Sequence, residues 1–103
     1  MNLDVIARTL GHARKNIGLS EVEAAHHAGV SVATIHNSES VHRAKSGRTI
    51  DLRTFLSLLS AYRLTMATFE RLAADLAIRS RLEEFERRLD KLEKSAVGHQ
   101  NDG

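Results

Sequence analysis

Six histidines are the side chains of this 103-residue sequence best suited to binding a metal or transferring a proton. They are His12, His26, His27, His36, His42 and His99. None of them has the spacing to acids or thiols that is typical of a metal site or a catalytic pair. The chain also has no cysteine, no glycine-rich phosphate loop and no evident nucleophile with its base. We therefore expect no enzyme activity, no metal and no cofactor.

Basic side chains are concentrated in the segment SVHRAKSGRT, residues 40–49, which holds Arg43, Lys45 and Arg48 and no acid. Residues 1–64 carry eight Lys/Arg against five Asp/Glu, whereas residues 65–103 carry seven against eight. The net charge of +2 is too small to predict nucleic-acid binding by itself. The position of the basic segment is compatible with phosphate contacts, and the alternative is an ordinary solvated loop.

The elements that carry these side chains are all predicted to be helical. The chain has no proline and is rich in Ala, Leu, Arg and Glu, so the sequence predicts an all-α protein. Apolar residues at helical spacing predict a first helix over residues 3–16, which Gly18 ends. Asp51 is expected to cap a fourth helix, over residues 51–62. The residues we expect this helix to bury are Leu52, Phe55, Leu56 and Leu59.

Residues 20–39, SEVEAAHHAGVSVATIHNSE, predict two short helices joined by a tight turn. Ser20 with Glu23 forms a capping-box pattern, and Gly29 supplies the turn. Ser31 is expected to cap the next helix, over residues 31–39, and Ile35 to point inward. This is the layout of a helix-turn-helix unit.

A fifth helix, capped by Thr65, is predicted over about thirty residues, because no Gly or Pro occurs between Leu64 and Val97. Its first part carries an apolar stripe that closes the core. Its second part carries a heptad seam, half a turn away, that faces a partner. The seam residues are Ile78, Leu82, Phe85, Leu89, Leu92 and Ala96. Residues 98–103 are expected to be disordered, and no apolar run is long enough to cross a bilayer, so we expect a soluble, cytoplasmic protein.

Charges beside the seam predict how two copies would pair. With Leu82 and Leu89 at a positions, arginines occupy g positions and glutamates occupy e positions. These flanking residues are Arg81, Arg88, Glu86 and Glu93. A parallel homodimer pairs Arg81 with Glu86 and Arg88 with Glu93, whereas an antiparallel one places like charges together. The sequence therefore favours a parallel homodimer.

The order of these elements resembles the XRE, or Cro/CI-type, helix-turn-helix family of phage and bacterial transcriptional regulators. The resemblance covers about residues 3–72. It is carried by ARKNIGLS (13–20), AGVS (28–31), TI (34–35), Glu39 and DLRTFLSLLSAYRLT (51–65). It implies a five-helix DNA-binding domain over residues 1–74, and the heptad seam predicts that a coiled-coil dimerisation helix follows over residues 75–97. It also implies a structural ion pair between Arg14 and Glu39.

The resemblance further implies which residues would contact double-stranded DNA. The second helix of the motif would enter the major groove with its N-terminal residues toward the bases. The expected contacts are Ser31, Val32, Ala33, Thr34, His36 and Asn37, with Arg43, Lys45 and Arg48 on the backbone or in the minor groove. Asn37 is the best candidate for bidentate readout of adenine. The alternative for these residues is a plain surface role.

Glu21 departs from the family pattern, because it puts an acid where a phosphate contact is common. Ala24 and Ser38 stand where larger apolar residues are usual, and the loop after residue 39 is longer. We expect a repressor that binds a palindromic operator as a homodimer, with half-sites roughly 10 bp or a multiple apart. The alternative is a protein-binding module on the same scaffold: an antitoxin, an anti-repressor or a phage inhibitor of a host complex. No small-molecule ligand is expected.

Overall fold

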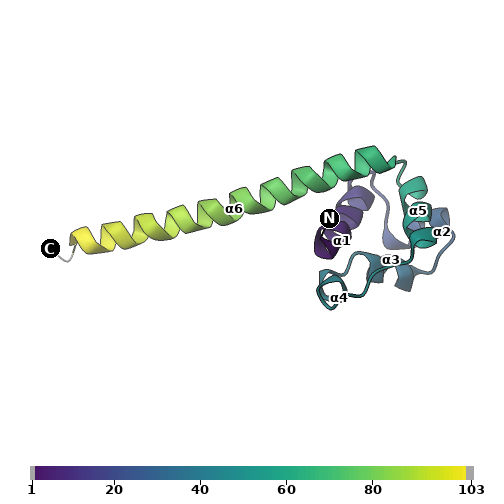
Figure 1. Cartoon of the computed structure of the whole chain (residues 1–103), viewed down its shortest axis with the longest axis horizontal. Coiled ribbons are helices and arrows are strands. Elements are labelled where there is room, and N and C mark those ends of the chain that lie inside the picture. Colours follow the sequence, from purple (N-terminus) through teal and green to yellow (C-terminus); the bar gives the residue numbers. More distant parts are fainter. Residues whose placement is uncertain (1, 102–103) are drawn as a thin grey trace.

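The computed structural model describes residues 2–101, with side chains described for residues 2–95, and this part of the chain contains helices and no strand (Figure 1). The helices are α1 (Leu3–Asn16), α2 (Glu21–Ala28), α3 (Val32–Ser38), α4 (Val41–Lys45), α5 (Leu52–Ala61) and α6 (Met66–Asn101). The all-α prediction is thus confirmed for the described residues.

Side-chain caps begin the helices where the sequence predicts them. Ser20 accepts a hydrogen bond from the Glu23 N–H at 3.1 Å, and the Glu23 carboxylate accepts one from the Ser20 N–H at 3.1 Å. Ser31 caps α3, Asp51 caps α5 and Thr65 caps α6 through the N–H three residues on. Each cap satisfies a backbone donor that the helix itself leaves unpaired.

The core lies where α1, α2, α3, α5 and the start of α6 meet. Its largest fully buried apolar and aromatic side chains are Leu10, Ile35, Leu58, Tyr62 and Phe69. Phe69 of α6 meets Phe55 of α5 edge to face, with ring centroids 5.0 Å apart. The first apolar stripe of α6 therefore closes the domain, as predicted.

Two residues of α5 that we expected to be buried are on the surface. Leu52 is 69% exposed and Leu56 is 49% exposed. The inner face of α5 is instead formed by Leu58, Leu59 and half-buried Phe55. Leu52 and Leu56 follow helical spacing, but they lie beside the stripe that faces the core.

The segment expected to be an open basic loop contains a helix of its own. Ser40 caps α4 by accepting a hydrogen bond from the Arg43 N–H at 3.3 Å, and Ala44 is buried. Contacts of α4 with α1 hold the segment against the domain. Residues 2–101 consequently contain six helices, whereas the resemblance implies five.

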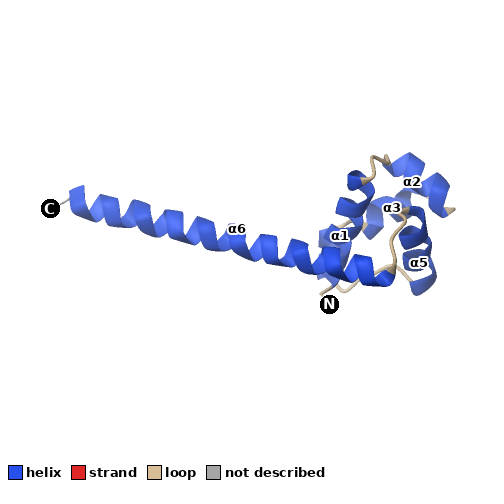
Figure 2. Ribbon diagram, turned by 90° about the horizontal axis from the view of Figure 1, so that it is seen from above, coloured by secondary structure: helices blue, strands red, loops and turns tan. Residues whose placement is uncertain are grey.

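The last helix is much longer than the others. α6 has 36 residues and continues through Gly98 to Asn101, whereas we expected the chain to leave the helix at Gly98. At 1.5 Å per residue it is about 54 Å long, and it gives the molecule extents of 65 × 25 × 24 Å. Figure 2 shows it leaving the other helices as one uninterrupted rod. Ala96 and the other side chains beyond Ser95, and residues 102–103, lie outside the described part.

None of the described helices is both long enough and apolar enough to span a membrane.

Candidate nucleic-acid interface

The turn between α2 and α3 depends on the conformation of Gly29. This residue has a φ of 70°, in the left-handed region that L-residues with a side chain adopt at a cost. The Val30 N–H returns to the Ala25 carbonyl at 3.0 Å, which completes the end of α2. Ala24 and Ala25 are buried, and small side chains there let α3 approach α2 closely.

One side of α3 is buried and the other is open to solvent. Ile35 is fully buried, and the Ser38 hydroxyl donates to the Ile35 carbonyl at 2.7 Å inside the domain. The exposed residues of this helix are Val32, Ala33, His36 and Asn37. The structure therefore brings together, on one surface, four of the side chains that the resemblance assigns to base contacts.

Ser31 and Thr34 differ from these four, because their hydroxyls already interact with each other. Their oxygens are 2.9 Å apart, and the Ser31 oxygen also accepts from the Thr34 N–H. Thr34 is half-buried. Only one of the two hydroxyl protons is used in this contact, so the pair retains one donor for a further acceptor such as phosphate.

Arg14 and Glu39 attach the end of α3 to α1. The Arg14 Nε donates to Glu39 Oε2 at 2.7 Å and its Nη2 to Glu39 Oε1 at 2.9 Å, while Nη1 donates to the Leu19 carbonyl at 2.8 Å. The hydrogen bond with Glu39 raises the pKa of Arg14. The ion pair that the resemblance implies is thus present, and Arg14 also holds the segment that leads into α2.

Gly11 makes room for this pair. A Cβ atom at Gly11 would lie 3.1 Å from Glu39 Oε1, which is tighter than a normal contact. Burial first and the charge of Glu39 second raise the pKa of the Tyr62 phenol to about 12. Its hydroxyl is buried and has no hydrogen-bond partner among the described residues.

Glu21 and His36 approach each other across the helix-turn-helix. Glu21 Oε1 at the start of α2 is 3.6 Å from His36 Nδ1 on the exposed side of α3. The sequence identified both residues but not their contact. Glu21 opens α2 and His36 lies one helical turn into α3, so their contact depends on how the two helices cross and could not be found from their spacing in the sequence.

The three basic residues after α3 lie on or next to α4. Arg43 is half-buried, whereas Lys45 and Arg48 are exposed. The Arg48 N–H bonds to the Arg43 carbonyl at 2.9 Å, so the segment folds back on itself and not into a free arm. The segment that carries these cations packs against α1 through α4.

The described residues contain no cluster of three or more His, Cys, Asp or Glu that could hold a metal ion. A comparison of the chain with protein-family models, with curated proteins and with solved structures found no match. The likeness to the XRE family accordingly rests on features of the sequence alone.

Proposed function

We propose that the chain is a sequence-specific DNA-binding transcription regulator of the XRE, or Cro/CI, type that acts as a repressor. Two copies, joined through α6, would bind the half-sites of a palindromic operator. The observation that carries this proposal is the exposed side of α3, where Asn37 and His36 stand beside Val32 and Ala33 while Ile35 anchors the helix in the core.

Each exposed residue of α3 has a chemistry that base edges recognise. The Asn37 amide offers a donor and an acceptor that match adenine, and the Val32 and Ala33 side chains suit the thymine methyl group. Lys45 and Arg48 would bind phosphates and position the domain without reading sequence. With so few polar groups, DNA shape and half-site spacing would contribute much of the specificity.

A rigid attachment of α3 supports the same function. Base readout requires a helix that keeps its angle to the groove, and the Arg14–Glu39 pair fixes the end of α3 to α1 with two short hydrogen bonds. The capped start of α3 and the left-handed Gly29 fix its other end.

The second candidate function is protein binding on this scaffold, as in an antitoxin, an anti-repressor or a phage inhibitor. Glu21 favours it, because its carboxylate lies beside His36 on the surface that would meet phosphate. Val22, next to Glu21, is 65% exposed and Val32 of α3 is 41% exposed, so both helices also present apolar side chains to solvent.

A salt series separates the two functions. The protein is titrated into fluorescent DNA fragments at several salt concentrations, and the logarithm of the binding constant is plotted against that of the salt. DNA binding predicts a steep negative slope, because each neutralised phosphate releases counterions. The variant Lys45→Gln should reduce the slope by about one unit, whereas Lys94→Gln on α6 should not. No binding at low salt would favour the protein-binding function.

A further inference from the structure

The second half of α6 is exposed to solvent along its described length. Each residue from 81 to 95 is exposed. The large apolar residues of the seam are far more exposed than core residues. Their exposed fractions are Ile78 56%, Leu82 55%, Phe85 58%, Leu89 44% and Leu92 66%. Within residues 81–95 the structure gives two ion pairs, both i,i+4: Arg88–Glu84 at 2.8 Å and Lys94–Asp90 at 3.3 Å. Such pairs contribute little to a helix without packing.

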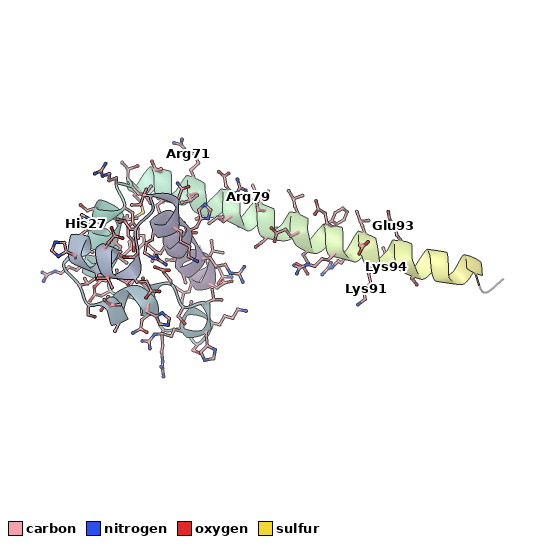
Figure 3. All side chains as sticks on the ribbon, turned by 180° about the vertical axis from the view of Figure 1, so that it is seen from behind. His27, Arg71, Arg79, Lys91, Glu93 and Lys94 are labelled. Carbon is pink, nitrogen blue, oxygen red and sulfur yellow. The ribbon has the colours of Figure 1, made fainter. Side chains whose placement is uncertain are left out.

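The seam lies on the side of α6 opposite the folded domain. Ala73, which is buried against the domain, precedes Leu82 by nine residues, which is about half a turn at 100° per residue. In Figure 3, Arg71 and Glu93 point away from the domain and Lys91 points to the other side of the helix. A second helix can therefore lie along the seam without meeting α1 to α5.

The apolar part of this stripe begins abruptly at Ile78. Arg71 precedes Ile78 by seven residues and Asp75 precedes Leu82 by seven, so both lie on the seam's stripe, and both are exposed. In a parallel pair the two Asp75 carboxylates would face each other, and like charges there oppose close packing. The helices can thus pack from Ile78 onward and separate toward the domains.

Charges along the seam favour one orientation of a second copy. In a parallel pair Arg81 faces Glu86 of the other copy and Arg88 faces Glu93 of the other copy. In the single chain Arg88 donates to Glu84 of its own helix, which lies outside the seam. In a parallel dimer the Arg88 guanidinium would therefore lie between this Glu84 and Glu93 of the other copy.

We propose that α6 binds α6 of a second copy as a parallel, in-register coiled coil that begins at Ile78, with the two N-terminal domains on its outer faces. The role of the coil in presenting two α3 helices rests on the proposed function, but the coil itself is independent of DNA. Asp75 marks the N-terminal boundary of the coiled coil, and the exposed seam forms its interface.

The mass of the protein in solution gives the first test. Sedimentation equilibrium at tens of micromolar should show two chains, and the double variant Leu82→Lys/Leu89→Lys should raise the dissociation constant by about 100-fold or more. Tyr62 is the only tyrosine and is buried in the domain, so its near-ultraviolet circular dichroism should be unchanged in that variant. A monomeric wild-type protein would overturn the proposal.

Orientation is tested by cross-linking, which the absence of native cysteine simplifies. Parallel pairing places the two copies of residue 92 side by side, so Leu92→Cys should oxidise to a disulfide-linked dimer. In an antiparallel pair centred on Phe85, residue 92 would face residue 78, about 21 Å along the helix. Cross-linking only in a mixture of Ile78→Cys and Leu92→Cys chains would contradict the parallel arrangement.

The start of the coil is tested by Asp75→Leu, which adds an apolar layer. It should lower the dissociation constant about tenfold, whereas Asp90→Leu, outside the seam, should leave it unchanged. An unchanged dissociation constant for Asp75→Leu would contradict the claim that the coiled coil ends at this residue. These measurements contain no DNA, so a dimer that fails to bind DNA would overturn the proposed function alone.

Discussion

Arg14 of α1 and Glu39 at the end of α3 form a bidentate ion pair, with nitrogen–oxygen distances of 2.7 and 2.9 Å. Their side chains are 9% and 13% exposed, so water screens the pair little. Because Arg14 also donates to the Leu19 carbonyl, one guanidinium joins α1, the segment before α2 and the end of α3. The angle of the exposed side of α3 to the rest of the domain therefore depends on this pair.

Removing one member of the pair should strongly destabilise the domain. We expect Arg14→Met to lower the free energy of unfolding by about 3 kcal/mol, because it leaves the Glu39 carboxylate with no cation in a mostly buried site. Urea denaturation followed by circular dichroism measures the change. Lys94→Met breaks the exposed pair with Asp90 and serves as the control, with little expected change. Similar losses in both variants would contradict a special role for Arg14.

Tyr62 offers a substitution that should increase stability. Its hydroxyl is buried without a hydrogen-bond partner in the described structure, and the desolvation of such a group is unfavourable. We expect Tyr62→Phe to raise the free energy of unfolding by about 1 kcal/mol. A loss of stability in this variant would show that the hydroxyl makes a hydrogen bond in solution.

The same residue predicts sensitivity to alkali. Burial raises the pKa of Tyr62 from 10.0 to about 12, so the folded protein holds the phenol proton more tightly than the unfolded chain. The resulting stability is present below pH 10 and is lost as the pH rises toward 12. Because the chain has one tyrosine, its absorbance at high pH reports this titration directly, and Tyr62→Phe should remove that part of the pH dependence.

Local sequence signals predicted the helix starts well, because a cap depends on residues three positions apart. Ser20, Ser31, Asp51 and Thr65 all cap as expected. The short α4 was missed, since a five-residue helix has almost no periodicity and its burial depends on α1. The exposure of Leu52 was not predicted for a similar reason. Helical spacing indicates which side of α5 is apolar, but the width of the stripe that becomes buried depends on the helices that pack against it.

Contacts between elements were only partly predictable. The Arg14–Glu39 pair followed from the family resemblance, not from the residues alone. The approach of Glu21 to His36 depends on how α2 and α3 cross, which the spacing of either residue along the chain does not reveal. The exposed seam of α6 was predictable, because a heptad pattern half a turn from a buried stripe must face away from the domain.

Arg63 holds an unfavourable backbone conformation at the end of α5. Its φ is 58°, and the Leu64 N–H donates to the Leu59 carbonyl at 2.9 Å. This is the Schellman pattern, in which one residue of left-handed conformation ends an α-helix. Arg63→Gly should therefore stabilise the protein by about 1 kcal/mol. Arg71→Gly, within exposed α6, should destabilise it by about 1 kcal/mol. Thermal unfolding of both variants checks this, and a loss of stability in Arg63→Gly would contradict it.

Glu21 should limit the affinity for DNA. Its carboxylate lies on the surface that would meet phosphate, 3.6 Å from His36. We expect Glu21→Gln to strengthen DNA binding about threefold to tenfold at low salt, and less at high salt, because the repulsion is screened. Glu70→Gln changes an exposed acid on α6 and is the matched control. Weaker binding by Glu21→Gln would show that Glu21 instead supports the interface.

The central claim is that α3 reads a DNA sequence, and selection of bound fragments from genomic DNA tests it most directly. Wild-type protein should enrich a twofold-symmetric site with half-sites about 10 bp or a multiple apart. Asn37→Ala should relax the preference at one base pair in each half-site, whereas Asn16→Ala, an exposed control on α1, should enrich the same site as the wild type. Enrichment of no site by the wild-type protein, or an unchanged site with Asn37→Ala, would contradict sequence reading by α3.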